Sequence, residues 1–167
     1  MPKPGTPAPA LVAHRLDGPD MDLSAIRGEA FVVFFRGLHC PACRKQLEDL
    51  VAHLPAFAER GLTVLAVSMD PEDRARAVAA DWAVGGIDIA HGMTEATARE
   101  WGLWVSDRVV EKEPPRFSEP ALTWVLADGT VGAHWQQSVP FGRPAFEDIL
   151  SGIDFVRAND RPPRGAA

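Results

Sequence analysis

Apolar positions along the chain fall into short continuous runs and into stripes with helical spacing. Residues 30–36 and 62–68 are almost entirely apolar, which is typical of strands buried on both faces of a parallel sheet. Between them, a helical stripe predicts a helix from Pro41 to about Gly61, and Pro55 within it is expected to kink or split that helix. The stripe consists of Leu47, Leu50, Val51, Leu54, Phe57 and Ala58.

The remaining patterns continue this alternation of strands and helices. Asp70-Pro71-Glu72 combines a capping residue, a first-turn proline and an acid, which predicts a helix that runs to about Trp82. Ala127-Asp128-Gly129 separates two apolar segments, which indicates a β-hairpin. The other predicted elements are strands at 10–16 and 87–90, a short helix at 94–101, an irregular segment at 102–118 and a last helix at 143–157.

This order of elements predicts the fold class. A central strand–helix–strand unit, followed by a hairpin and a final helix, is the arrangement of the thioredoxin-like fold, an α/β fold in which helices flank a central mixed β-sheet. The length of 167 residues and the apolar content of 46% fit a single domain with a substantial core. We expect that domain at residues 10–157, between a flexible arm at 1–9 and a flexible tail at 158–167.

Charge and composition argue against several kinds of partner. The net charge of −6 argues against nucleic acid or an anionic membrane surface as the main partner. No apolar run reaches the about 18–20 residues that a membrane span needs. The first nine residues lack the apolar core of a signal peptide, so we expect a cytoplasmic protein.

The only two cysteines, Cys40 and Cys43, stand two residues apart between a predicted strand and a predicted helix. In an alternating α/β pattern, this C-x-x-C pair is the signature of a thioredoxin-like redox site. Residues i and i+3 share one face of the first helical turn, so the two sulfurs can close a small ring. Cys40 is predicted to cap the helix and Pro41 to begin it, which would stabilise a Cys40 thiolate. We expect Cys40 to be the nucleophile and Cys43 the resolving thiol.

Two other interpretations of the cysteine pair are a structural disulfide and half of a zinc site. A disulfide across so short a loop would constrain the unfolded chain little. A zinc site would need two further Cys or His ligands at matching spacing, whereas the five histidines lie singly. The redox pair is therefore favoured, and neither a metal nor an organic cofactor is expected.

Residues 34–43 resemble the active-site segment of peroxiredoxin-like proteins in the alkyl hydroperoxide reductase/thiol-specific antioxidant family. The likeness continues through 62–70, 98–102, 118–120 with the following hairpin, and 140–144, and it covers about residues 10–157. It implies a peroxide or disulfide substrate and a thioredoxin- or glutathione-type reductant, with a homodimer as a candidate assembly. A redox-sensing interaction module is the alternative from another class.

The sequence also departs from the pattern of this family. Typical members carry Pro-x-x-x-Thr/Ser-x-x-Cys, whose hydroxyl positions the peroxide together with an arginine. Here Val33 and Gly37 occupy the two motif positions. By the hairpin alignment, Pro120 stands where many members supply the arginine, and Arg36 and Arg44 are candidate substitutes. Both a peroxide and a disulfide therefore stay open as the oxidant.

Three more residues join the expected site. Pro120 is expected to follow a cis peptide bond that faces the dithiol, as in thioredoxin-like proteins, with an edge-strand or turn proline as the alternative. Glu119 is a candidate base for Cys43, because the strand before the dithiol offers no acid. His39 is a candidate acid or base, or a cation that lowers the pKa of Cys40. Glu119 and His39 are each also compatible with a structural role.

Overall fold

A computed structural model describes residues 2–166 and centres on a mixed sheet of seven strands, in the order β2-β1-β5-β4-β3-β8-β9. The strands of this sheet are β1 (Val12–Arg15), β2 (Met21–Asp22), β3 (Glu29–Phe34), β4 (Leu62–Val67), β5 (Asp88–His91), β8 (Ala121–Val125) and β9 (Val131–Gln136). A separate two-stranded sheet joins β6 (Val105–Asp107) to β7 (Arg116–Ser118).

Strand β3 lies at the centre of the sheet and carries the site at its carboxyl end. It pairs in parallel with β4 and antiparallel with β8, so that Phe34 stands opposite both Val67 and Ala121. Alternate residues of β3 face the two layers of the core, and none of Phe31–Phe34 is exposed. Burial on both faces explains why this strand is a continuous apolar run.

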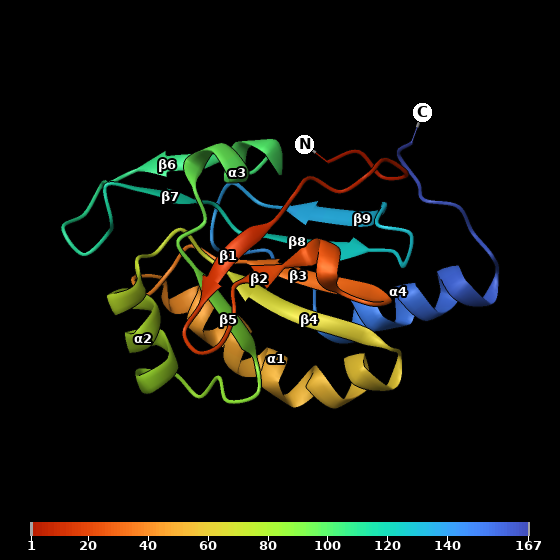
Figure 1. Cartoon of the computed structure of the whole chain (residues 1–167), viewed down its shortest axis with the longest axis horizontal. Helices are drawn as coiled ribbons and strands as arrows, with labels where there is room; N and C mark the ends of the chain where they lie inside the picture. Colours follow the sequence, from red (N-terminus) through yellow and green to blue (C-terminus); the bar gives the residue numbers. More distant parts are fainter. Residues whose placement is uncertain (1, 167) are drawn as a thin grey trace.

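The helices are distributed over both faces of the sheet, as Figure 1 shows. Beneath the sheet in that view lie α1 (Pro41–Glu59), α2 (Glu72–Asp81) and α4 (Phe146–Ala158), and above it lies α3 (Glu95–Glu100) with the β6–β7 hairpin. A short 3₁₀ helix, η1 (Leu23–Ala25), follows β2. The predicted thioredoxin-like α/β fold, with a central mixed sheet flanked by helices, is confirmed.

Helix α1 continues through Pro55 without a break, so Pro55 does not split the helix, and a kink at this residue stays a prediction. A proline removes one N–H and crowds the carbonyl four residues earlier, here that of Val51. Pro55 is exposed, so water can bind the released carbonyl on the outer face. The buried face of the same helix, with Leu47, Leu50 and Phe57, stays packed against the sheet.

The segment 102–118 was expected to be irregular, but it contains β6 and β7. Three residue pairs join these strands, from Val105 opposite Ser118 to Asp107 opposite Arg116. Strands of three residues are too short to show alternation in the sequence. The prolines Pro114 and Pro115 fall in the connecting loop, where a missing N–H costs no ladder hydrogen bond.

The N-terminal segment lies beside the start of β9. Gly5 N donates a hydrogen bond to Val131 O at 2.7 Å, and Val131 N donates one to Thr6 O at 2.9 Å. The limits 10–157 and the flexibility of the two ends stay predictions. No helix within residues 2–166 is long and apolar enough to cross a membrane.

Candidate active site

Cys40 forms the N-terminal cap of α1, and Pro41 occupies its first turn. The Cys40 backbone is extended (φ −102°, ψ 101°), which turns its side chain back over the first turn. Its Sγ accepts a hydrogen bond from the backbone N–H of Cys43 at 3.2 Å. The sulfur therefore satisfies one of the free N–H groups at the positive end of the helix.

Cys43 lies one turn further along α1, on the side that faces the core. Its Sγ accepts hydrogen bonds from the backbone N–H of Arg36 at 3.4 Å and from Nη2 of Arg143 at 3.2 Å. The guanidinium of Arg143 also donates to Gln46 Oε1 and to Pro140 O. Both cysteines are free thiols, and each is at most 1% exposed.

The two cysteines differ sharply in acidity. A hydrogen bond from Cys43 lowers the pKa of Cys40 to about 6, against the opposing effect of burial, and the charges of Arg143 and Arg36 add to the lowering. Burial raises the pKa of Cys43, and its hydrogen bond to Cys40 raises it further. At neutral pH the arrangement is a Cys40 thiolate beside a protonated Cys43.

The loop between β3 and α1 is held by a buried carboxylate. Asp70 Oδ2 accepts a hydrogen bond from Leu38 N at 2.7 Å, and Oδ1 accepts one from Nε of Arg74 at 2.9 Å. Gly37 has a φ of +117°, and a Cβ there would collide with the Asp70 carboxylate. Cys40 N in turn donates to Gly37 O at 3.1 Å. Asp70 therefore positions the loop that delivers Cys40, instead of capping its own helix.

His39 is buried against the β6–β7 hairpin. Its ring lies 4.6 Å from the ring of Phe117, and its Nδ1 lies 3.5 Å from Nη2 of Arg74. Burial, together with the charge of Arg36, lowers the pKa of His39 to about 4. The imidazole is therefore neutral at neutral pH, which argues against a cationic His39 that lowers the pKa of Cys40. A role of His39 as acid or base stays a prediction.

Glu119 is buried, but its carboxylate points to the hairpin and to Arg36. Oε1 accepts a hydrogen bond from Ser106 Oγ at 2.6 Å. Oε2 lies 3.3 Å from Nε of Arg36 and forms an ion pair that lacks the alignment of a hydrogen bond. Within residues 2–166 no hydrogen bond joins Glu119 to either sulfur, so its role as a base for Cys43 stays a prediction.

The Arg36 side chain also faces the hairpin. Its guanidinium lies over the ring of Phe117, 4.6 Å from the centroid, and 3.8 Å from Glu113. Arg36 thus reaches the dithiol with its backbone N–H and its charge. Arg44, the other candidate substitute, donates to Glu48 at 2.8 Å and is half exposed. No hydrogen bond within residues 2–166 joins Arg44 to a sulfur.

The peptide bond between Glu119 and Pro120 is trans, because no cis bond occurs among the described residues. The expected cis bond is therefore wrong. Glu119 N donates to Trp104 O at 2.7 Å, and Gln137 N donates to Pro120 O at 3.3 Å. Glu119 and Pro120 therefore connect β7 of the two-stranded sheet directly to β8 of the central sheet, and each residue adds one hydrogen bond beyond the end of its strand.

The sequence analysis missed Arg143 as a site residue. Its segment, 140–144, contributed to the family resemblance, but nothing in the local pattern indicated a contact with Cys43. The contact joins residues 100 positions apart and depends on how the segment before α4 packs against α1. Arg143 supplies a cation at the dithiol, whereas the sequence indicated Arg36 and Arg44 as candidates for the arginine that positions a peroxide.

A thioredoxin-like fold with a free C-x-x-C pair at the start of a helix defines the class of thioredoxin-fold thiol proteins. Within that class, the model of the AhpC/TSA family matches residues 4–133. The chain belongs to this family.

Solved structures agree with this fold. Mycobacterium tuberculosis AhpC superposes with a TM-score of 0.78 at 13% identity, over 96% of each chain. Enterococcus faecalis AhpC superposes with a TM-score of 0.76 at 18% identity, over 96% of this chain and 97% of that one. At these identities the likeness establishes the fold alone.

Curated relatives match a shorter region. A putative peroxiredoxin of Mycobacterium tuberculosis is 33% identical over 72 residues, which is 42% of this chain and 46% of the relative. The thiol-disulfide oxidoreductase ResA of Bacillus anthracis is 28% identical over 69 residues, 41% of this chain and 40% of ResA. The match thus spans less than half of either relative.

Proposed function

We propose that the protein is a thiol-dependent oxidoreductase in which Cys40 attacks the oxidant and Cys43 closes a Cys40–Cys43 disulfide. The observation that carries this proposal is the unequal pair of thiols at the N-terminus of α1. The pKa of Cys40 is lowered to about 6, so its thiolate dominates at neutral pH. The pKa of Cys43 is raised, which keeps its proton in place until Cys40 has reacted.

With a hydroperoxide, the Cys40 thiolate attacks one peroxide oxygen and the O–O bond breaks. The leaving alkoxide takes up a proton and departs as an alcohol, and Cys40 becomes a sulfenic acid. Cys43 then loses its proton and attacks the sulfenic sulfur. A disulfide forms and water leaves, so that the dithiol has supplied two electrons. Arg143, 3.2 Å from Cys43 Sγ, would stabilise the developing thiolate of Cys43.

With a disulfide substrate, the Cys40 thiolate attacks one sulfur and forms a mixed disulfide. Cys43 then attacks Cys40, releases the second substrate thiol and leaves the same internal disulfide. Two observations favour this second candidate. Val33 and Gly37 stand at the positions of the family's peroxide-binding motif, and ResA, a thiol-disulfide oxidoreductase, is among the relatives.

The reductant that restores the dithiol is proposed to be an external thiol of the thioredoxin or glutathione type. We further infer work in the cytoplasm, because a reactive dithiol without a structural disulfide suits a reducing compartment. A homodimer is the candidate assembly, and sedimentation of the reduced and oxidised protein tests it. A dimer that forms only on oxidation would favour the redox-sensing alternative.

The test of the proposed function is stopped-flow tryptophan fluorescence of the reduced protein mixed with hydrogen peroxide. Fast oxidation that requires Cys40, with a trapped sulfenic acid in Cys43→Ser, would support the peroxidase. Oxidation no faster than that of a free thiol would overturn the peroxidase. Reduction of a protein disulfide, assayed in parallel, then decides whether the second candidate holds.

A further inference from the structure

An open cleft of about 480 Å³ lies next to the dithiol. His39 and Pro41, the two chain neighbours of Cys40, both line it. Cys40 itself is 1% exposed, so an oxidant has to approach it from an adjoining surface. The cleft provides such a surface, because the residues before and after Cys40 in the chain both line it.

Three cations from three different elements line this cleft. Arg44 comes from α1, Arg74 from α2 and Lys112 from the loop between β6 and β7. Acidic residues are absent from its described lining. This local charge is opposite in sign to the net charge of −6 of the whole chain. An electropositive cleft in an acidic protein attracts an anionic ligand.

The cations differ in how far they are already neutralised. Arg74 is paired with the buried Asp70 at 2.9 Å, and Arg44 is paired with Glu48 at 2.8 Å. Lys112 forms no ion pair with any residue from 2 to 166. His39 adds no charge at neutral pH, because its pKa is lowered to about 4. Lys112 is therefore the cation most available to bind an anion. Arg44 ranks second, because its partner Glu48 is partly exposed, whereas the partner of Arg74 is buried.

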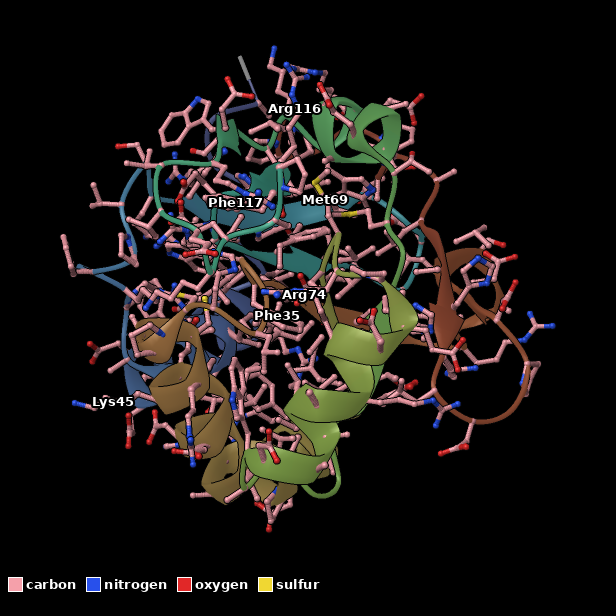
Figure 2. All side chains as sticks on the ribbon, turned by 90° about the vertical axis from the view of Figure 1, so that its left-hand side faces the viewer. Phe35, Lys45, Met69, Arg74, Arg116 and Phe117 are labelled. Carbon is pink, nitrogen blue, oxygen red and sulfur yellow. The ribbon has the colours of Figure 1, made fainter. Side chains whose placement is uncertain are left out.

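The rest of the lining is apolar and comes from Leu38, Pro41 and Trp82. The Trp82 ring is almost completely buried and packs against Phe35, with 6.4 Å between the ring centroids, so only a small part of it faces the cleft. Figure 2 shows Lys45 projecting outward from α1, on the side away from Phe35 and Arg74. A cleft with an apolar wall and cations fits an amphipathic molecule.

We propose that this cleft binds the carboxylate of an oxidant that carries an apolar chain, and thereby brings its hydroperoxide or disulfide group to Cys40. The inference rests on the proposed function, since it names the substrate class of the same site. Lys112 and Arg44 hold the carboxylate, and Trp82 and Leu38 cover the chain. A neutral ester of the same molecule loses the charge pairing and keeps only the apolar contact.

The first experiment measures binding without any reaction. Octanoate is titrated into the reduced protein, with Trp82 as a reporter by tryptophan fluorescence and Trp82→Phe as the control for that signal. Lys112→Gln and Arg44→Gln are each expected to weaken octanoate binding about two- to fivefold, as for a partly exposed charge pair. Lys45→Gln removes the same charge outside the cleft and is expected to leave the affinity unchanged. Methyl octanoate is expected to bind more weakly than octanoate.

Equal affinity for octanoate and methyl octanoate would overturn the proposal. So would an equal loss of affinity in Lys45→Gln and Lys112→Gln, since the effect would then follow net charge alone.

The second experiment measures substrate choice. An eight-carbon hydroperoxide with a terminal carboxylate is compared with its methyl ester, and an aromatic disulfide with carboxylates is compared with a neutral disulfide. For each pair we take the ratio of kcat/KM for the carboxylate substrate to kcat/KM for the neutral substrate. This ratio is expected to fall in Lys112→Gln and to remain unchanged in Lys45→Gln. The pair of substrates that shows this change identifies whether the oxidant is a peroxide or a disulfide.

Assays with hydrogen peroxide distinguish a failure of the proposed function from a failure of carboxylate binding in the cleft. If the unaltered protein consumes hydrogen peroxide but does not bind octanoate, the cleft proposal fails and the proposed function stands. If Lys112-dependent octanoate binding is found while neither hydrogen peroxide nor a disulfide oxidises Cys40, the proposed function fails and the cleft still binds carboxylates.

Discussion

Two junctions in this molecule have the same local design and different outcomes. Each leads from a buried parallel strand through a polar residue and a proline into a helix: Cys40-Pro41 before α1 and Asp70-Pro71 before α2. At the first junction the side chain of Cys40 caps its own helix. At the second, Pro71 is the cap residue, no side chain caps α2, and Asp70 binds Leu38 instead.

The difference shows that the second junction supports the first. Aspartate is a stronger helix cap than cysteine in general, so local preference alone would place Asp70 on α2. Because β3 and β4 are adjacent and parallel, their carboxyl ends lie side by side, and Asp70 faces the loop before Cys40. The partly buried N–H of Leu38 needs an acceptor within the protein more than the solvated start of α2 does.

The largest expected effect comes from removing the nucleophile at the first junction. Cys40→Ser is expected to lower the rate of oxidation by at least about a thousandfold, because a serine hydroxyl is not ionised at neutral pH. Cys43→Ser is expected to keep the first step and to stop at the sulfenic acid. Mass spectrometry after a dimedone chase distinguishes the two. Equal loss of the first step in both variants would contradict the assignment of roles.

Asp70→Asn breaks the support from the second junction. It leaves Arg74 without its buried partner and weakens the acceptor of Leu38 N, so we expect a loss of about 3 kcal/mol in the free energy of unfolding. Asp73→Asn, in the exposed first turn of α2, is the matched control, with an expected change of at most about 0.5 kcal/mol. Urea unfolding measures both, and similar losses would refute the special role of Asp70.

Gly37→Ala tests the close contact between the Gly37 backbone before α1 and the Asp70 carboxylate before α2. Gly37 and Gly61 both have positive φ, so an alanine is strained at either position. Only at Gly37 does the added methyl group meet the Asp70 carboxylate. We expect Gly37→Ala to cost about 2 kcal/mol and Gly61→Ala about 1 kcal/mol. Urea unfolding of the two variants, together with the reactivity of Cys40, checks this order.

The pH dependence of the Cys40 thiolate tests which group lowers the pKa of Cys40. Thiolate absorbance at 240 nm is expected to fall as the pH drops through about 6, since protonation removes the thiolate. Cys43→Ala is expected to raise this midpoint more than Arg143→Gln, because the hydrogen bond from Cys43 is the largest cause of the lowered pKa. A larger shift in Arg143→Gln would make the charge of Arg143 the dominant cause.

Local sequence predicted the fold and the dithiol with good accuracy. The apolar runs at β3 and β4 and the stripe on α1 identified the central strand–helix–strand unit, since periodicity depends only on near neighbours. The position of Cys40 at the start of α1 followed from the adjoining proline and the helical spacing of Cys43. The small β6–β7 sheet was missed, because strands of three residues leave too little pattern.

The sequence by itself determined which thiols are available and that they begin a helix. The i, i+3 spacing of Cys40 and Cys43 and the proline between them are local properties of the chain. The tertiary structure alone decided what surrounds them. Asp70 acts on a residue 32 positions away, and Arg143 on one 100 positions away. The neutral state of His39 comes from burial. The trans bond at Pro120 lies between two residues that form backbone hydrogen bonds, Glu119 with Trp104 and Pro120 with Gln137. Burial and pairing are set by contacts between distant segments, and no local pattern in the sequence encodes them.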